Sequence, residues 1–347
     1  MSRKGGGIAV IGAGSWGTTL ANLLAEKEEE VTLWVFEEDL CRILGERREN
    51  DFFLPGIRLA DSLRFTRSLE EALTGREAIL CALPSHAVRN IFHEGKAYLG
   101  QGALIISATK GLEDGTWQTP SQVLREVLGD RLQLEIASLS GPSFAKEVSR
   151  RIPAAVAVAG STPRAAQRAQ ELFFRPYFRV YTNPDLLGVE MGGAVKNVMA
   201  IAAGAADGLG FGHSSRAALI TRGLAEMTRL GVSLGALRPT FFGLAGLGDL
   251  VLTCTGDLSR NRQVGLELGK GRTVQEILGG MRMVAEGVRT AKALRELSRR
   301  QKVEMPITEK VYEILYQGKD PREAVQDLMS RLPRSEREDL SSDFCSL

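Results

Sequence analysis

In the first half of the chain, short apolar runs alternate with longer stretches in which apolar residues recur at helical spacing. Glycine, proline, serine or charged residues bound each apolar run, as expected for buried strands. This alternation indicates βαβ units and a mostly parallel sheet. The predicted strands are Ile8–Ile11, Val31–Val35, Ala78–Leu83, Leu104–Ala108, Ile136–Leu139, Ala154–Val158 and Phe178–Tyr181, and the predicted helices between them include Thr18–Lys27 and Pro120–Leu128.

The pattern changes near Leu187, where strand-like runs end and windows with a 3.6-residue period follow. We therefore predict a doubly wound α/β domain over residues 1–187 and an all-helical domain over 188–332. Residues 333–347 are charged with little periodicity, and we expect a mobile tail there. The expected helices of the second domain are Val189–Ala206, Arg216–Gly231, Val264–Lys270, Thr273–Gly279, Val288–Arg300, Pro306–Gln317 and Pro321–Ser330.

Composition adds limits on function rather than on fold. A net charge of +2 over 347 residues implies no bulk attraction to nucleic acid or membranes. The N-terminal apolar run is too short for a signal peptide, and no membrane-spanning segment is recognised, so we expect a cytoplasmic protein. The three histidines and four cysteines have neither metal-ligand spacing nor a catalytic-triad pattern, so no metal or disulfide is expected.

The first chemical motif is the glycine-rich stretch "IGAGSWG", which contains Gly12, Gly14 and Gly17. It directly follows a predicted strand and directly precedes a predicted helix, which is the context that a dinucleotide fingerprint requires. The first glycine permits a tight turn, the second lets the backbone approach a pyrophosphate, and the third lets helix and strand pack closely. We therefore interpret the first domain as a Rossmann-type fold that binds NAD or NADP, in preference to a glycine turn without a ligand.

The end of the second strand, "WVFEED", bears on cofactor choice. One of the acidic residues Glu37, Glu38 and Asp39 could bind a ribose hydroxyl of NAD, or all could be first-turn acids of the next helix. An NADP site usually places an arginine here, and Phe36 carries no charge. The sequence therefore favours NAD, unless arginines further along the chain fold back over the adenosine; these are Arg42, Arg47 and Arg48.

Loops that follow two other strands carry polar groups beside glycine. Lys110 lies in "SATKGL" and Ser143 in "SGPSFA". Because ligands bind at the carboxyl ends of parallel strands, we expect these residues to share a site. A solvated loop lysine is the alternative for Lys110.

In the helical domain, Lys196 lies within the small, apolar stretch "MGGAVKNVMAIAAGAADGLG". Taken alone, it is equally well explained as a lysine that snorkels at the edge of a core helix. Asp249 lies among glycine and apolar residues, and "SRNR" presents Ser259, Arg260 and Asn261 in succession, a set suited to a phosphate or carboxylate. A helix N-cap at Ser259 with a solvated arginine, and ordinary helix-start chemistry for Glu286, are the alternatives.

Together the motifs "GAGSWGT", "LPSH", "ATKGL", "SGPSFA", "GAVKNVMAIAAGAADGLG", "AALITRGLAEM", "GLGDLVLTC" and "SRNR" resemble, in order, those of NAD(P)-dependent glycerol-3-phosphate dehydrogenases of the bacterial soluble type. The resemblance covers nearly the whole chain. It implies interconversion of dihydroxyacetone phosphate and sn-glycerol 3-phosphate, which supplies glycerol 3-phosphate for phospholipid synthesis. A homodimer with small-molecule substrates and no nucleic-acid partner is expected.

Residue by residue, the resemblance implies that Lys196 is catalytic and that Asp249 orients it or binds substrate. By the same resemblance, Lys196 lies in a cleft between the domains. There its ammonium would stabilise charge on the carbonyl oxygen and donate a proton. The implied substrate contacts are Lys110, Gly141, Ser143, Lys196, Asp249, Ser259, Arg260 and Asn261. The implied cofactor contacts are Ser15, Trp16, Lys110, Ala145, Arg260, Val284 and Glu286. The fingerprint glycines Gly12, Gly14 and Gly17, and Phe36 at the end of the second strand, complete the predicted cofactor site. The chain departs from the family pattern at Phe36, at Val195 and at Gly212, His213 and Ser214.

Two other functions remain open on the residues. One is a related dehydrogenase that acts on a hydroxy acid. Activity on a carboxylate substrate rather than on a triose phosphate would identify it. The other is a protein that senses NAD(P)H without turnover, against which the presence of Lys196, Asp249 and Arg260 argues.

Overall fold

The structure is a computed structural model of the chain, and it describes residues 6–27, 30–129, 133–281, 285–333 and 335–336. The chain divides into two compact units, Met1–Glu190 (unit 1) and Met191–Leu347 (unit 2). Most of the expected tail lies outside the described residues. Three cysteines, Cys41, Cys81 and Cys254, are free thiols.

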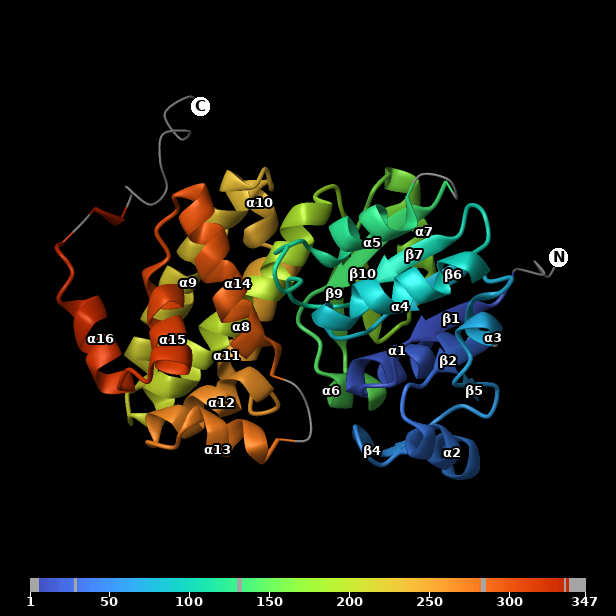
Figure 1. Cartoon of the computed structure of the whole chain (residues 1–347), viewed down its shortest axis with the longest axis horizontal. Coiled ribbons are helices and arrows are strands. Elements are labelled where there is room, and N and C mark those ends of the chain that lie inside the picture. Colours follow the sequence, from blue (N-terminus) through green and yellow to red (C-terminus); the bar gives the residue numbers. More distant parts are fainter. Residues whose placement is uncertain (1–5, 28–29, 130–132, 282–284, 334, 337–347) are drawn as a thin grey trace. The chain divides into compact units, whose positions relative to one another are not determined.

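Unit 1 contains a mixed eight-stranded sheet in the order β10-β9-β8-β7-β6-β1-β2-β5 (Figure 1). Neighbouring strands are parallel except β8 and β9, so β9 and β10 run opposite to the others. All seven predicted strands are present. The strands of this sheet are β1 (Ile8–Ile11), β2 (Val31–Trp34), β5 (Arg64–Thr66), β6 (Ala78–Cys81), β7 (Leu104–Ser107), β8 (Glu135–Ser140), β9 (Ala154–Gly160) and β10 (Phe178–Asn183).

Strand β5 was not predicted, because its three residues are too few to show alternation and include an exposed arginine. A second, two-stranded sheet formed by β3 (Glu49–Asn50) and β4 (Leu54–Arg58) was also missed. Both lie between β2 and β6, in the part of the chain that the sequence analysis left without strands.

Helices cover both faces of the large sheet. Ile8 and Val10 of β1 belong to one core with residues of α1 and α7, whereas Ala9 and Ile11 belong to a second core with residues of α3, α4 and α5. This is the doubly wound arrangement expected from the sequence. The helices of unit 1 are α1 (Ser15–Ala25), α2 (Glu38–Arg47), α3 (Leu69–Leu73), α4 (Val88–Gly95), α5 (Pro120–Leu128), α6 (Ala145–Ser149) and α7 (Pro163–Phe173), with short turns η1 (Ser85–Ala87) and η2 (Lys96–Tyr98).

The described part of unit 2 is helical. All seven predicted helices are present, with shifted ends. Three further helical segments between Arg238 and Thr255 were not predicted. The helices are α8 (Leu186–Gly208, which begins in unit 1), α9 (His213–Ser233), α10 (Arg238–Phe241), the π-helical turn η3 (Leu244–Gly248), α11 (Asp249–Thr255), α12 (Arg260–Gly269), α13 (Val274–Gly279), α14 (Glu286–Gln301), α15 (Pro306–Gln317) and α16 (Pro321–Met329).

Helix α8 is long and apolar enough to cross a membrane, but 83% of its most apolar window is buried inside the protein. Glycines explain how closely it packs. A Cβ atom on Gly204 would lie 2.0 Å from the Arg262 carbonyl oxygen of α12, and one on Gly265 would lie 2.0 Å from the Ile201 carbonyl oxygen of α8. Each helix therefore supplies a glycine where the other's backbone approaches.

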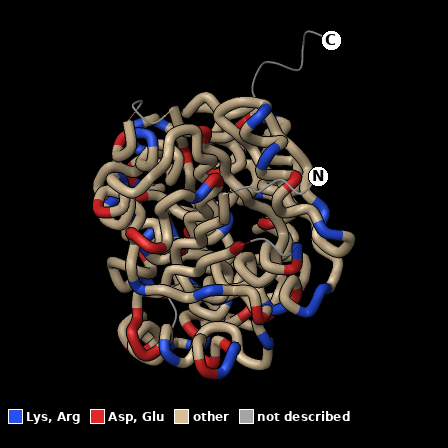
Figure 2. The backbone as a smooth tube through the Cα atoms, turned by 90° about the vertical axis from the view of Figure 1, so that its right-hand side faces the viewer, with Lys and Arg blue, Asp and Glu red and all other residues tan. Residues whose placement is uncertain are grey.

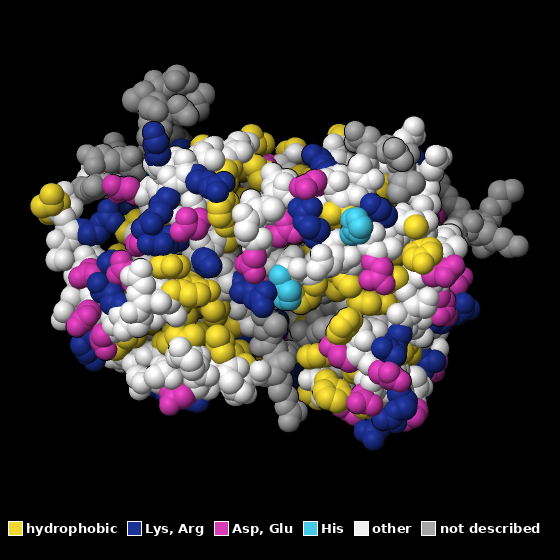
Figure 3. All heavy atoms as spheres, viewed as in Figure 1, with side chains coloured by type: hydrophobic (Ala, Val, Ile, Leu, Met, Phe, Trp, Pro, Cys, Tyr) yellow, Lys and Arg dark blue, Asp and Glu magenta, His cyan; other side chains and the backbone are white. Residues whose placement is uncertain are grey.

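Basic and acidic residues are interspersed along the chain (Figure 2). On the face of the molecule shown in Figure 3, they also alternate with apolar and neutral side chains. This mixture agrees with the near-zero net charge and gives no large single-sign surface on the face shown.

Candidate active site

The glycine-rich loop between β1 and α1 has the geometry of a phosphate-binding turn. Gly12 has φ +115°, and a Cβ atom there would lie 2.7 Å from the Ala82 carbonyl oxygen. A Cβ atom on Gly17 would lie 1.9 Å from the Gly12 carbonyl oxygen, whereas one on Gly14 would meet nothing within 4 Å. Two glycines thus permit close packing and the third leaves open space, so the loop fits the pyrophosphate of a dinucleotide.

Ser15 and Trp16 form the first residues of α1, whose N-cap Gly14 provides no side-chain cap. The loop is held from behind by Asn50, a residue that the sequence analysis did not select. Its buried amide donates to the Ala13 carbonyl oxygen (2.9 Å) and to the Thr18 hydroxyl (2.8 Å). Asn50 therefore fixes the loop and the first turn of α1 in one piece.

Ala145 begins α6, which lies beside α1. The Thr19 hydroxyl of α1 donates to the Ala145 carbonyl oxygen (3.3 Å) and shares a 2.8 Å hydrogen bond with the Ser149 hydroxyl. The tertiary structure thus brings Ala145 next to the helix that follows the glycine-rich loop, although many residues separate them in the sequence.

Lys110, Gly141 and Ser143 converge at the carboxyl ends of β7 and β8. The Lys110 ammonium donates to the Gly141 carbonyl oxygen (3.2 Å), and the Ser143 hydroxyl donates to the same oxygen (3.0 Å). Gly141 has φ +145°, and a Cβ atom there would lie 2.9 Å from the Val156 Cα atom, so only glycine fits. These three residues form one cluster on unit 1.

The Lys110 loop is anchored by a buried carboxylate three residues further along. Glu113 accepts two hydrogen bonds of 2.8 Å from the Arg89 guanidinium of α4, which hold the pKa of Glu113 below its usual value. The Thr116 hydroxyl also donates to Glu113 (2.5 Å). The loop is consequently a rigid support for Lys110.

In unit 2, Lys196 lies on α8 and is only 6% exposed. Its ammonium donates to the Asp249 carboxylate of α11 (2.5 Å) and to the Thr253 hydroxyl one turn later (2.9 Å). Lys196 is therefore a buried, paired ammonium rather than a snorkelling one. Removing one partner of a buried ion pair lowers the free energy of unfolding by about 3–5 kcal/mol, so separating Lys196 from Asp249 would be costly.

Two asparagines form a second chain of hydrogen bonds beside this pair. Asn261 on α12 donates to the Asn197 side-chain oxygen on α8 (2.9 Å), and its own oxygen accepts from the Gly287 N–H on α14 (2.9 Å). Asn197 and Thr253 were not among the residues predicted from the sequence, although Asn197 is next to Lys196 and Thr253 follows Asp249 by one helical turn.

Ser259 and Arg260 open α12. The Ser259 hydroxyl accepts from the Arg262 N–H (3.2 Å) and caps the helix, which is the alternative that the sequence left open for this residue. Arg260 is exposed as a whole residue. Desolvation around its guanidinium lowers the pKa of Arg260, and the nearby Glu286 carboxylate partly offsets this by raising it. Glu286 is a first-turn acid of α14, and the predicted cofactor residue Val284 lies outside the described residues.

At the end of β2, Glu38 and Asp39 lie in the first turn of α2, where the helix dipole stabilises acids. Phe36 is 69% exposed, and its ring centroid lies 6.1 Å from that of Trp34. An exposed, uncharged aromatic ring therefore stands where an NADP site usually places an arginine.

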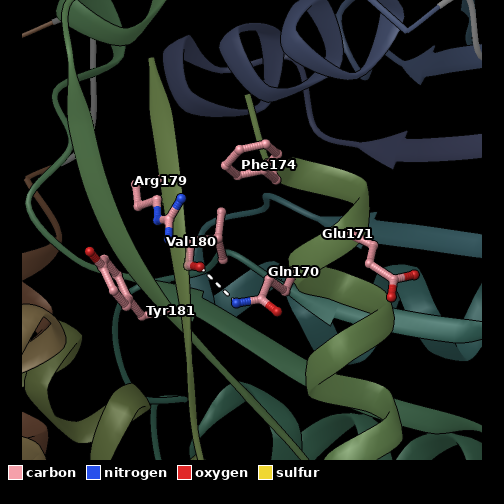
Figure 4. Close-up of a pocket in the computed structure, with 6 residues that line it drawn as sticks. All are labelled: Gln170, Glu171, Phe174, Arg179, Val180 and Tyr181. Atoms are coloured by element: carbon pink, nitrogen blue, oxygen red, sulfur yellow. Dashed lines mark hydrogen bonds between the residues drawn. The ribbon is translucent and has the colours of Figure 1, made fainter. Parts of the chain in front are cut away.

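Unit 1 also has a surface hollow of about 410 Å³, between α7 and the edge strand β10 (Figure 4). Arg179 lies 5.7 Å from the Phe174 ring and 5.6 Å from the Tyr181 ring, and Gln170 donates to the Val180 carbonyl oxygen. The hollow includes none of the predicted site residues. Among the described residues, no group of three His, Cys, Asp or Glu side chains could hold a metal ion.

Comparison with known proteins identifies the family. Residues 7–166 match the model of the NAD-dependent glycerol-3-phosphate dehydrogenase N-terminus, and residues 185–326 match that of its C-terminus. The chain is 56% identical over 329 residues to the glycerol-3-phosphate dehydrogenase [NAD(P)+] of Geobacter sp. strain M21, covering 95% of this chain and 98% of the relative. The chain belongs to the NAD-dependent glycerol-3-phosphate dehydrogenase family.

Solved structures agree with this membership. The glycerol-3-phosphate dehydrogenase of Coxiella burnetii is 40% identical with a TM-score of 0.90, covering 94% of this chain and 99% of that one. The enzyme of Saccharomyces cerevisiae is 30% identical with a TM-score of 0.80, covering 94% and 100%. The fold class predicted from the sequence, a Rossmann-type sheet followed by a helical domain, is confirmed.

Proposed function

We infer that this glycerol-3-phosphate dehydrogenase interconverts dihydroxyacetone phosphate and sn-glycerol 3-phosphate with NAD(P) as cofactor, and that Lys196 is its proton donor and acceptor. The single observation that carries the catalytic assignment is the buried contact between Lys196 and Asp249, extended to Thr253. The Lys196 ammonium is 6% exposed and held by two partners, so it is preorganised to stabilise charge at one point.

A nicotinamide cofactor held at Gly12, Gly14 and Gly17 would supply hydride to the carbonyl carbon in one direction and accept it in the other. As negative charge develops on the carbonyl oxygen, the Lys196 Nζ stabilises it and transfers a proton to it, which leaves a neutral amine and a hydroxyl group. In the oxidation direction the neutral Nζ takes the hydroxyl proton. Asp249 and Thr253 hold Nζ in one orientation throughout.

We propose that the substrate phosphate is bound by Arg260, because a guanidinium matches a phosphate with paired hydrogen bonds. Its position at the start of α12 places it beside the capped N-terminus of that helix. The other proposed substrate contacts are Lys110, Gly141, Ser143, Ser259 and Asn261.

We assign the cofactor to the glycine-rich loop on the fit of Gly12, Gly14 and Gly17 described above. Ser15, Trp16, Phe36, Lys110 and Ala145 are the further proposed contacts on unit 1, and Arg260, Val284 and Glu286 those on unit 2. The product would serve phospholipid synthesis. We propose that the protein is cytoplasmic and forms a homodimer. Sedimentation of the purified chain would test the homodimer.

The activity is tested by following NADH oxidation with dihydroxyacetone phosphate. We expect turnover that depends on both the triose and its phosphate. Pyruvate, a keto acid, and unphosphorylated dihydroxyacetone are the matched controls. Faster turnover of pyruvate than of dihydroxyacetone phosphate would assign the chain to hydroxy-acid chemistry instead, and cofactor binding without any turnover would indicate a sensor.

A further inference from the structure

The three arginines considered for an NADPH phosphate have other partners. Arg42 pairs with Asp39 and Glu46, and Arg47 pairs with Asp51. The Arg48 guanidinium donates to the Leu63 carbonyl oxygen and lies 5.2 Å from the Phe65 ring centroid. Of these contacts, the one between Arg42 and Asp39 lies near the end of β2, but at 3.7 Å it is longer than the 2.8 Å pair of Arg67 with Glu38.

A different arginine reaches that position, because β5 pairs with β2. Trp34 lies opposite Thr66 in this parallel pair, and the Val35 N–H donates to the Thr66 carbonyl oxygen (2.9 Å). Arg67 therefore follows β5 at the same edge of the sheet where Phe36 follows β2. In Rossmann-type folds the ribose that carries the 2′-phosphate of NADP lies at this edge.

Arg67 is held in place at both its backbone and its side chain. The indole N–H of Trp34, which is 4% exposed, donates to the Arg67 carbonyl oxygen (2.9 Å). The Arg67 guanidinium donates to the Glu38 carboxylate in the first turn of α2 (2.8 Å). The backbone anchor fixes where the side chain starts, and Glu38 fixes where it points.

The pair between Arg67 and Glu38 is open to solvent, with side chains 51% and 79% exposed. Exposed pairs of this kind contribute little to stability, because water and salt screen them. A phosphate dianion offers the same guanidinium a stronger, paired set of acceptors. Exchange of Glu38 for a phosphate at Arg67 is therefore energetically feasible without disturbing the fold.

We propose that Arg67 is the residue of this chain that binds the 2′-phosphate of NADPH, and that Glu38 limits NADPH binding by competing for the same guanidinium. The inference rests on the proposed function only in taking unit 1 as the cofactor domain. It reconciles an acidic β2 end with a family that uses either cofactor, because the positive charge comes from a neighbouring strand.

The test compares Arg67→Gln, Glu38→Gln and the double variant by their ratios of kcat/KM for NADPH and NADH. Arg64→Gln is the matched control, since Arg64 lies on β5, the strand that Arg67 follows, is 67% exposed and pairs with Glu30. We expect Arg67→Gln to lower the NADPH-to-NADH ratio about tenfold and Glu38→Gln to raise it at least about threefold. Arg64→Gln should leave it unchanged.

The double variant separates competition from simple repulsion. If Glu38 acts through Arg67, Glu38→Gln has no effect on the ratio once Arg67 is glutamine. An equal effect in both backgrounds would overturn the proposed competition, and an Arg67→Gln ratio no different from that of Arg64→Gln would overturn the role of Arg67.

Direct binding keeps this test independent of turnover. Calorimetry with adenosine 2′,5′-bisphosphate and with AMP reports the contribution of the 2′-phosphate alone. Arg67→Gln should weaken the bisphosphate about tenfold and leave AMP unchanged, whereas equal weakening of both ligands would overturn the proposal. Absent turnover with intact discrimination between the ligands would instead refute the proposed function.

Discussion

Lys110 and Lys196 are both ammonium groups predicted to serve the same reaction, yet the protein holds them in different ways. Lys196 lies on a buried helix and contacts a carboxylate and a hydroxyl on another helix. Lys110 lies on a loop, is half-buried and donates to the Gly141 backbone oxygen. The contacts of Lys196 fix its protons at one point, whereas Lys110 presents a positive charge on a rigid loop.

This comparison implies that the two lysines contribute to different kinetic steps. A group that transfers a proton acts mainly in the transition state and is expected to change kcat. A charge that binds an anionic substrate equally well before and during the reaction changes KM.

The largest effect is expected at Lys196. Lys196→Ala should lower kcat by roughly 10²–10⁴-fold, because general acid–base groups contribute on this scale, while leaving cofactor binding intact. Steady-state reduction of dihydroxyacetone phosphate, with NADH binding followed by fluorescence, measures both. A near-normal kcat would end the assignment.

Because Lys196→Ala leaves Asp249 buried without this cation, the variant could unfold. The double variant Lys196→Met with Asp249→Asn removes both charges and avoids an uncompensated buried carboxylate. It should fold, bind NADH and remain inactive.

The next effect is expected at Arg260. Arg260→Leu should lower kcat/KM for dihydroxyacetone phosphate by about 10- to 100-fold, the equivalent of losing a charge-assisted hydrogen bond of about 1.5–3 kcal/mol. Unphosphorylated dihydroxyacetone lacks the bound group and should lose much less. Equal losses for both substrates would show that Arg260 does not bind phosphate, and the KM for cofactor is measured in parallel because Glu286 lies near this side chain.

A smaller effect is expected at Lys110. Lys110→Met should raise the KM for dihydroxyacetone phosphate about tenfold and change kcat less than Lys196→Ala does. Initial rates over a range of substrate concentrations separate the two parameters. A loss confined to kcat would mean that Lys110, like Lys196, acts in the chemical step rather than in substrate binding.

The smallest effect concerns cofactor preference at the acidic end of β2. We expect the wild-type chain to use NADH at least as well as NADPH, and Phe36→Arg to shift the preference toward NADPH by a few-fold, because an exposed guanidinium there attracts a phosphate through solvent. Initial rates with both cofactors test this. A wild-type kcat/KM tenfold higher with NADPH would show that positive charge dominates this edge despite the acids.

Much of the fold could be predicted from local pattern. The seven longer strands of the large sheet are apolar and bounded by turn residues, and the glycine fingerprint needs only its own spacing and its flanking elements to be recognised. Strand β5 could not be predicted, because three residues carry no period, and its stability comes from pairing with β2. Arg67 was overlooked for the same reason.

The candidate site shows the same division. Sequence determined which residue types are present: glycines where the backbone must turn, a lysine in an apolar helix, and a serine, an arginine and an asparagine in succession. Only the tertiary structure decided that Lys196 meets Asp249 and Thr253 and that Asn261 meets Asn197. The physical reason is that helical and strand periods are local properties of the chain, whereas the partner of a buried charge depends on which distant elements pack together and on the penalty for leaving that charge unpaired.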